Sequence, residues 1–525
     1  MLNIIEVVFG LMATVAGLAL LARKLSIPYP ILLVMGGLLL GLVPGLPRVR
    51  LDPELVFLFF LPPLLYPAAL FTPWRDFRAN LRPISLLAVG LVLFTTVAVG
   101  FLAHYFIPDL PLAAGFVLGA IISPPDAIAA SAIAERLSVP RRIITILEGE
   151  SLVNDATALV AFRFAVAAVV TGSFSLAHAS GQFFIVGIGG ILIGLVVGFL
   201  TVWVQKRIDD PPIEITISLI TPFAAYLPAE QLGVSGVLAV VTTGLYHGWR
   251  IPEFTSSRTR LLAGPVWQMI EFVLNGFIFL LIGLQLPEVL RHSAGQPIAQ
   301  LVGYAAAISL AVILIRILWV FPASYLPRLL FKRIRARDPY PAWQHVTIVA
   351  WTGMRGVVSL AAARALPLSF PGRDLILFLT FMVILATLVV QGLSLPAIIR
   401  WLGVEDDGAA AKEEREARLK ANEAALARLN EIGETKAANA EILQRMRVEY
   451  EDRIRQLEVG EPETGGTPRG LFSSDYERLA SEALLVERKI ILQLRNEGII
   501  NDEVLRRIQR DIDLAEARLS HPGRQ

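Results

Sequence analysis

The stretch AIISPPDAIAASAI, Ala120–Ile133, places an aspartate in the middle of an apolar segment. Pro124 and Pro125 remove two backbone hydrogen-bond donors directly before Asp126, so a helix running through this segment is expected to break here. A break exposes helix ends and carbonyl oxygens, which transporters with discontinuous helices use to hold ions near the membrane midplane. The stretch therefore predicts an ion site on an interrupted helix.

A second apolar segment carries the same kind of interruption. In WTGMRGVVSLAAARALP, Trp351–Pro367, the glycines Gly353 and Gly356 flank the intramembrane cation Arg355. Broken helices in corresponding halves of a chain are typical of inverted structural repeats. We therefore expect an inverted repeat with one broken helix in each half, although a pair of Pro/Gly kinks used for packing is the alternative.

The composition indicates the solvent in which this chain folds. Of its 525 residues 55% are hydrophobic and 18% are charged, and the mean hydropathy is +0.61. The apolar residues form blocks of about 20, enough for a helix to cross a bilayer. The chain is therefore predicted to be a polytopic membrane protein whose partner is the lipid bilayer. A net charge of only +2 gives no general attraction to nucleic acid.

Hydropathy and helix breakers predict about 13 transmembrane helices, and loop charges predict their direction. Alternate loops hold 18 basic residues, whereas the intervening loops hold only Arg48, Arg50, Arg291 and Arg373. Because basic residues accumulate on the cytoplasmic side, we expect the N-terminus outside and the C-terminus in the cytoplasm of a cell (plasma or inner) membrane. The expected helices lie near residues 2–22, 29–45, 54–71, 84–106, 112–134, 142–170, 182–205, 213–227, 234–248, 262–286, 299–322, 344–366 and 374–402.

The composition changes abruptly after Trp401. The run EDDGAAAKEEREARLKANEAALARLNEI, residues 405–432, is rich in charges and helix formers. We therefore divide the chain into a transmembrane domain, residues 1–403, and a soluble helical tail, residues 404–525, which Gly460–Gly470 splits into two parts. The predicted fold class is all-α.

The stretch LEGESLVNDATALVAF, Leu147–Phe162, brings polar residues into a membrane helix. On a helical wheel one arc holds five polar residues, which predicts a face exposed to water: Glu150, Ser151, Asn154, Asp155 and Thr157. Of these, Ser151, Asn154 and Asp155 can enclose, together with Asp126, a site of oxygen donors, the ligands that suit Na+. A buried carboxylate can hold a proton instead of the cation. Binding one or the other at Asp155 predicts a secondary transporter that exchanges cation for proton one for one, without net charge movement and without a cofactor.

Two other classes of protein fit these residues less well. An intramembrane protease would need Ser235 and His247 to meet, but twelve residues of helix separate them by about 18 Å. We therefore expect no enzyme activity, with Ser235 a packing residue and His247 an interfacial one. A cation channel needs a continuous polar path, which few intramembrane charges supply here.

These residues resemble a known family, the monovalent cation:proton antiporters, in the sodium/proton exchanger branch with animal Na+/H+ exchangers and bacterial NhaP-type proteins. The resemblance covers roughly residues 5–402 through the motifs FFLPPLLY, ISPPDAIAA, EGESLVNDATALV, AYLPAEQLGVSG and GMRGVVSLAAA. It implies a homodimer with a mobile core that serves pH and sodium homeostasis. K+/H+ exchange is the alternative activity.

The resemblance also assigns roles to single residues. It makes Asp155 the carrier of cation and proton, with Asn154 beside it and Asp126 at the crossing of the unwound helices. It pairs Glu150 with Arg316 as a structural ion pair, and it gives Arg355 the role of compensating helix-end charge at the second unwound helix.

The chain departs from the family pattern at three places. Tyr66 and Pro67 stand where many relatives have a carboxylate, Ala127 replaces a proline, and Asn275 lies where animal exchangers carry a glutamate. These departures leave the preference among Na+, Li+ and K+ and the full set of donors open.

Overall fold

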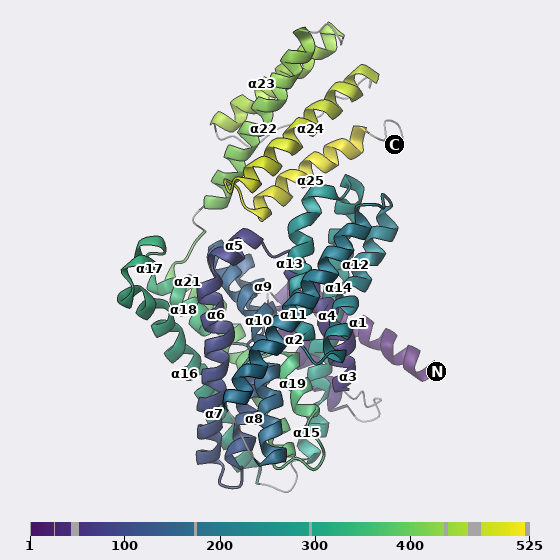
Figure 1. Ribbon diagram of the computed structural model, residues 1–525. Coiled ribbons are helices and arrows are strands. Elements are labelled where there is room, and N and C mark those ends of the chain that lie inside the picture. The colour runs from purple at the N-terminus through teal and green to yellow at the C-terminus, as the bar shows by residue number, and fades with distance from the viewer. Residues whose placement is uncertain are drawn as a thin grey trace.

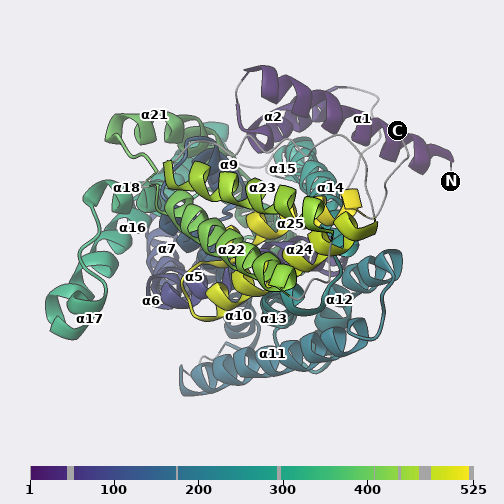
Figure 2. The same ribbon diagram turned by 90° about the horizontal axis from the view of Figure 1, so that it is seen from above.

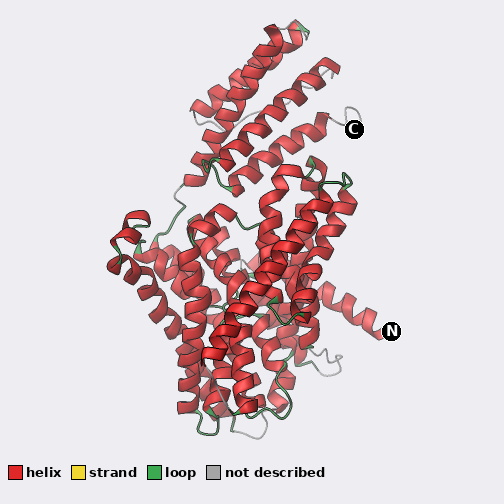
Figure 3. Ribbon diagram, in the orientation of Figure 1, coloured by secondary structure: helices red, strands yellow, loops and turns green. Residues whose placement is uncertain are grey.

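Helices make up the secondary structure of the whole described part of the chain. The structure, a computed structural model, describes residues 2–25, 27–43, 52–172, 176–292, 297–406, 408–434, 439–459 and 474–519. Within these ranges no strand occurs (Figure 3). A chain that crosses lipid must satisfy its backbone hydrogen bonds internally, and helices do so within one segment. The predicted all-α class is confirmed.

Every stretch expected to cross the membrane contains a helix. In the described residues, nine helical stretches are long and apolar enough to span a bilayer, so the chain is a multi-pass membrane protein. The π-helical turns η1 (Val56–Phe60), η2 (Leu86–Leu91) and η3 (Thr387–Gln391) join α3 to α4, α6 to α7 and α20 to α21. The helices up to residue 402 are α1 (Leu2–Leu25), α2 (Tyr29–Gly41), α3 (Pro53–Leu55), α4 (Leu61–Leu70), α5 (Trp74–Ala79), α6 (Leu81–Ser85), α7 (Val92–Phe106), α8 (Leu112–Ile122), α9 (Ile128–Arg136), α10 (Arg141–Thr171), α11 (Leu176–Gln205), α12 (Pro211–Gln231), α13 (Gly236–Phe254), α14 (Ser257–Leu284), α15 (Leu286–His292), α16 (Ile298–Leu330), α17 (Lys332–Arg337), α18 (Trp343–Trp351), α19 (Val357–Arg364), α20 (Arg373–Ala386) and α21 (Gly392–Leu402).

The membrane helices, labelled in Figure 1, pack into two groups by their mutual contacts. In the first, α13 packs against α4, α11 and α12, while α14 packs against α1 and α2; we call α1, α2, α4 and α11–α14 the scaffold body. In the second, α8 packs against α7 and α10, α16 against α7, α18 and α20, and α19 against α8 and α20; we call α5–α10, α16 and α18–α21 the core body. Helix α10 also touches α4 and α13, so it lies on the boundary between the two bodies.

Close backbone contact fixes the scaffold body where α2 crosses α14. A methyl group on Gly37 would lie 2.2 Å from the carbonyl oxygen of Leu280, and one on Gly283 would lie 2.2 Å from that of Val34. Small residues permit this approach, which is the usual way that helices associate tightly in lipid.

Both interrupted segments lie in the core body. Helix α8 ends at Ile122 and α9 begins at Ile128, so the break falls at the two prolines. Helix α18 ends at Trp351 and α19 begins at Val357, and that break contains both glycines and Arg355. The positions that lack a donor or a side chain are thus the positions where the helices end.

The tail forms a small helical unit with its own hydrophobic clusters. It contains α22 (Ala409–Glu434), α23 (Ala440–Val459), α24 (Ser474–Asn496) and α25 (Asp502–Leu519). Its clusters involve residues from Ala417 onward, whereas the cluster of the membrane helices extends to Val404. Seen from above, the tail lies across the middle of the membrane helices (Figure 2). The predicted division at Gly460–Gly470 lies outside the described residues.

Candidate cation and proton site at the helix crossing

The two breaks meet, and their backbones are bonded to each other. The N–H of Asp126 donates to the carbonyl oxygen of Met354 at 2.7 Å, and Pro125 and Arg355 form an isolated antiparallel bridge. The Asp126 Oδ1 atom accepts a hydrogen bond from the N–H of Ile128 at 2.9 Å, at the start of α9. The crossing thus fixes Asp126 between the end of one half-helix and the start of the next.

Asn154 ties α10 to this crossing. Its Nδ2 donates to the carbonyl oxygen of Pro125 at 2.6 Å, and its side chain is fully buried. Its Oδ1 is buried without a hydrogen-bond partner in the described part of the chain, so an oxygen donor is left over for a ligand. Proline at position 125 contributes here through its carbonyl, because the break frees that oxygen from the helix.

Asp155 faces a cavity rather than a protein partner. The cavity has a volume of about 820 Å³, and Asp126, Ser151 and Asp155 line it together. Within the described residues the Asp155 carboxylate has no hydrogen-bond or ion-pair partner, and the charge of Asp126 acts on it. Binding of a small cation or a proton therefore stabilises this carboxylate, which has no other positive partner among the described residues.

Further hydroxyl groups border the same cavity. Ser131 on α9 and Ser359 on α19 line it, and neither hydroxyl has a hydrogen-bond partner in the described part of the chain. The Oγ of Ser151 accepts a long bond of 3.4 Å from the N–H of Ala127. Sequence reasoning identified Ser151 but missed Ser131 and Ser359, although each lies on the half-helix that follows a break.

The predicted water-exposed face of α10 is wrong for three of its five members. Asp155 and Ser151 line the cavity, but Glu150 is 1%, Asn154 0% and Thr157 3% exposed. A helical wheel separates polar from apolar positions, whereas it does not distinguish polar side chains facing water from those facing partners in the protein. Here Glu150 faces Arg316 and Asn154 faces the crossing.

Arg316 holds Glu150 in a two-pronged ion pair. Its Nη1 and Nη2 donate to the two carboxylate oxygens at 2.6 and 2.8 Å, and both side chains are almost completely buried. Its Nε and Nη2 also donate to the carbonyl oxygen of Val349 on α18, at 3.2 and 3.1 Å. The pair thus joins α10, α16 and α18 beside the second break.

Arg355 is fully buried at the second break, where its donors meet helix ends. The Nε donates to the carbonyl oxygen of Ile122, the last residue of α8, at 2.9 Å, and Nη1 donates to that of Gly353. Its backbone N–H donates to Oγ1 of Thr387 at 3.1 Å. A guanidinium at the C-terminal end of a helix offsets the partial negative charge there. Thr387 was not identified from the sequence, since it lies in a different helix.

The three departures from the family pattern lie in different surroundings. The Tyr66 hydroxyl makes a 2.5 Å hydrogen bond with Nδ1 of His247, which is 2% exposed, so the expectation of an interfacial His247 is wrong. Pro67 and Ala127 line the cavity, whereas Asn275 is buried in α14. Ser235 is the N-cap of α13, with its Oγ accepting from the N–H of Leu238 at 3.2 Å.

Carboxylates that the sequence analysis left without a role border the same space. Glu148 on α10, Glu135 on α9 and Glu271 on α14 line the cavity, as do Asp406 and Glu503 from beyond the membrane helices. Such a lining attracts cations toward Asp155. Glu148 lies at the N-terminal side of the polar stretch, and this position was the one available signal for it.

Two interrupted helices that cross beside carboxylates on a cavity wall define the class, a secondary active membrane transporter. Known proteins agree. The profile of the family described as sodium/hydrogen exchanger, transmembrane, matches residues 10–401. A Mycobacterium tuberculosis protein named an uncharacterized Na(+)/H(+) exchanger is 36% identical, over 98% of this chain and 97% of that protein. A Bacillus subtilis protein named sodium, potassium, lithium and rubidium/H(+) antiporter is 38% identical, over 71% of this chain and 58% of its own length.

A solved structure shares the fold. The sodium proton antiporter MjNhaP1 from Methanocaldococcus jannaschii matches with a TM-score of 0.58 and 20% identity, over 77% of this chain and 98% of that one. At this identity the likeness concerns the fold alone. The chain belongs to the sodium/hydrogen exchanger family, and its activity is the exchange of Na+ or another monovalent cation for H+ across a membrane.

Proposed function

We propose that each turnover exchanges one monovalent cation for one proton at Asp155, with Asn154, Asp126 and Ser151 supplying further oxygen donors. Na+ is the proposed cargo and it binds at Asp155. The observation that carries the proposal is the Asp155 carboxylate, which has no hydrogen-bond or ion-pair partner among the described residues and lies on the wall of a cavity that reaches the helix crossing. Because one carboxylate cannot hold a proton and a cation at once, the two ligands compete.

The neighbouring residues support a neutral exchange. Asn154 cannot ionise, and its Nδ2 is already committed to Pro125. Glu150 is neutralised by Arg316. If only Asp155 changes occupancy, the charge carried by the site is the same with a proton as with Na+, so the cycle moves no net charge.

The surroundings of the buried charges support structural roles for them. Glu150 and Arg316 hold three helices of the core body together, and Arg355 compensates the C-terminal end of α8. No step of the exchange needs either arginine to release a proton, and no cofactor or enzymatic step enters the proposal.

K+/H+ exchange is the second candidate activity. Relatives from Bacillus subtilis and Bacillus pumilus are named for sodium, potassium, lithium and rubidium together, whereas one from Synechocystis is named a low-affinity Na(+)/H(+) antiporter. A site lined by several hydroxyls and carboxylates accommodates cations of different size more easily than a closed cage does.

We propose further that the protein is a homodimer in the cell membrane, with the tail in the cytoplasm. The exchange that it performs serves pH and sodium homeostasis. Basic loops around Arg75, Arg141 and Arg260 lie on the side of the tail, as the positive-inside rule requires for a cytoplasmic face. The spans of α1 and α11 are the least buried, since only 17% of the residues in the apolar segment of each are buried within the described chain. These helices of the scaffold body therefore face lipid or a second protomer.

Flux in proteoliposomes tests the proposed site. Purified protein should transport protons when Na+, Li+ or K+ is supplied in turn, and Asp155→Asn should abolish the flux while the protein keeps its elution volume and its melting temperature. Asp374→Asn is a matched control, since this carboxylate is half exposed at the start of α20. Retained cation-driven flux in Asp155→Asn would exclude Asp155 as the carrier.

A further inference from the structure

The tail closes over the cavity that leads to Asp155. Glu503, Arg506 and Arg507 of α25 line this cavity together with the membrane residues described above. Arg506 donates from Nη2 to the carbonyl oxygen of Phe71, the C-cap of α4, at 2.8 Å. The tail therefore supplies part of the wall of the space through which a cation on this side approaches.

Arg506 brings a positive charge into that space. Burial lowers the pKa of Arg506, whereas Asp502, Glu503 and Glu148 favour its charged form. A guanidinium among the carboxylates of the cavity competes with an entering cation for the same negative charge. Its position thus opposes cation entry from the side of the tail.

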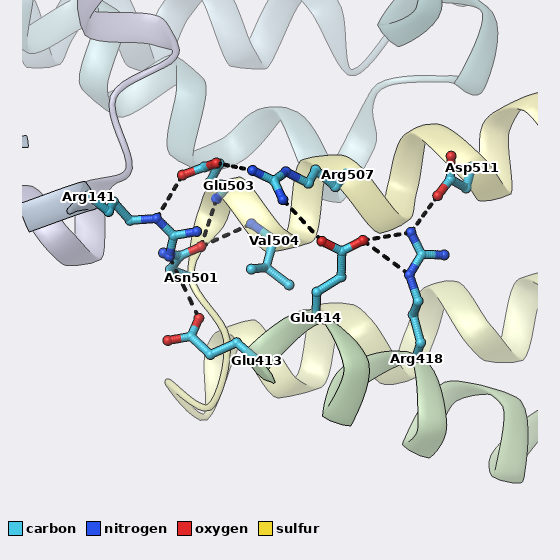
Figure 4. Close-up of polar contacts among 9 residues, drawn as sticks. All are labelled: Arg141, Glu413, Glu414, Arg418, Asn501, Glu503, Val504, Arg507 and Asp511. Carbon is cyan, nitrogen blue, oxygen red and sulfur yellow. Dashed lines mark hydrogen bonds and ion pairs between the residues drawn. The ribbon is translucent and has the colours of Figure 1, made fainter. Parts of the chain in front are cut away.

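Helix α25 touches the core body through the N-terminus of α10 and through α5. Arg141 donates from Nε to Glu503 at 2.8 Å, and Asn501 donates from Nδ2 to Asp76 at 3.0 Å (Figure 4 shows the first of these). Glu503 also accepts from Arg507 at 2.8 Å, and Arg507 in turn contacts Glu414 of α22 at 3.2 Å. The contact with the core body is therefore continuous with the charge network inside the tail.

The same helix touches the scaffold body. Arg260 of α14 binds Asp513 through two hydrogen bonds of 2.8 and 2.5 Å, and Asp513 is 2% exposed. Arg506 reaches α4, and Arg495 of α24 donates to the carbonyl oxygen of Trp249 on α13 at 3.4 Å. One rigid helix is thus bonded to both bodies at once.

We propose that α25 is a reversible link between the core and scaffold bodies that also holds Arg506 across the cation entrance. Movement of the core body and entry of the cation then both require the link to open. The inference rests on the proposed exchange at Asp155. The contact with the core body suits a reversible link, because the Arg141–Glu503 pair is partly exposed, and such pairs are individually weak and are screened by salt.

Cross-linking gives a direct test, since the chain contains no cysteine. The variant Arg141→Cys, Glu503→Cys loses the ion pair to the core body, so its flux in proteoliposomes should exceed that of the wild type by about twofold or more. A bis-methanethiosulfonate reagent should then stop the flux, and a reducing agent should restore it. Unchanged flux after complete cross-linking would overturn the link.

Two controls separate the link from other effects. Arg418→Cys, Asp511→Cys joins α22 to α25 inside the tail, where the native pair is 2.5 Å apart, and its cross-link should leave the flux intact (Figure 4). Glu503→Cys alone, carrying the same reagent, should remain active; if it stops, bulk in the cavity causes the arrest and the link is refuted. Absence of flux in the wild type would instead refute the proposed exchange.

The role of Arg506 has its own readout. Arg506→Ala should lower the apparent KM for Na+ offered on the side of the tail by about two- to fivefold, the size expected for removing one nearby charge. The apparent KM from the opposite side should not change. Arg510→Ala, at an exposed position of the same helix, is the matched control. An unchanged KM in Arg506→Ala would show that this cation does not oppose entry.

Discussion

Arg316 donates hydrogen bonds to both carboxylate oxygens of Glu150, at 2.6 and 2.8 Å, and both side chains are almost completely buried in the core body. Removing one partner leaves the other charge buried without compensation, at a cost of about 3–5 kcal/mol. Glu150→Ala should therefore lower the thermal unfolding temperature and the yield in detergent. The surviving protein should retain the apparent KM for Na+ of the wild type, and a stable variant with a shifted KM would instead place Glu150 in the cation site.

Gly356 leaves room for Asp126 at the crossing. A methyl group at this position would lie 2.2 Å from the Asp126 Oδ2 and 2.8 Å from its Cγ. Gly356→Ala should displace the carboxylate and reduce cation-driven flux about tenfold or more, given the sensitivity of sites to misplaced groups. Gly303→Ala is the matched control, because nothing lies within 4 Å of a methyl group there, and it should keep its flux. Equal flux in both variants would contradict this account of Asp126.

Deletion of the tail should leave the exchanger running. The tail packs around its own hydrophobic clusters, while Val404 belongs to the cluster of the membrane helices. A chain ending after Glu405 should therefore fold and transport cations, with a rate at least equal to that of the full chain and with a shifted pH profile. Size-exclusion elution reports its folding and proteoliposome flux its activity. Complete loss of flux in a well-folded truncation would mean that the tail supplies a necessary group.

Membrane voltage should not alter the rate. Each net charge moved per cycle would change its energy by about 2.3 kcal/mol per 100 mV, which is readily seen in liposomes. Exchange of one cation for one proton at Asp155 moves none. Flux measured with the potential set by a K+ gradient and ionophore should stay constant, provided that the cation panel shows no transport of K+. Strong acceleration would require a second titrating group, and Asp126 on the same cavity is the first candidate.

Low pH should weaken the apparent affinity for Na+ without lowering the maximal rate of exchange. Protons and Na+ compete for the same carboxylate, so the apparent KM for Na+ should rise as the pH falls, while the maximal rate at saturating Na+ stays nearly constant. Initial rates over a grid of Na+ concentration and pH measure both quantities. A maximal rate that falls in parallel with affinity would show that the two ligands do not share one site.

Local features of the sequence predicted much of this structure, because their physics is local. Pro124, Pro125, Gly353 and Gly356 limit helix formation at their own positions, and the helices end there. Asp155 could be identified because placing a carboxylate in an apolar membrane segment costs free energy, whatever the surrounding tertiary structure.

Pairings across the chain could not be obtained in the same way. Glu150 and Arg316 are separated by 166 positions, and this pairing was inferred only from family resemblance. The contact of Arg141 with Glu503 and the bond of Tyr66 with His247 depend on how distant helices pack, and nothing in the neighbouring residues specifies them. The prediction that Glu150 and Asn154 face water was wrong for the same reason, because each side chain contacts a partner distant in the sequence instead of solvent.

The bond from the Asp126 N–H to the Met354 carbonyl has a consequence for translocation. Each break is bonded to the other break instead of to solvent, so the backbone around Asp126 keeps its shape without bound water. In the proposed exchange, a site built on bonds within the core body stays assembled when that body moves. The barrier to crossing then arises from repacking the boundary between the core body and the scaffold body.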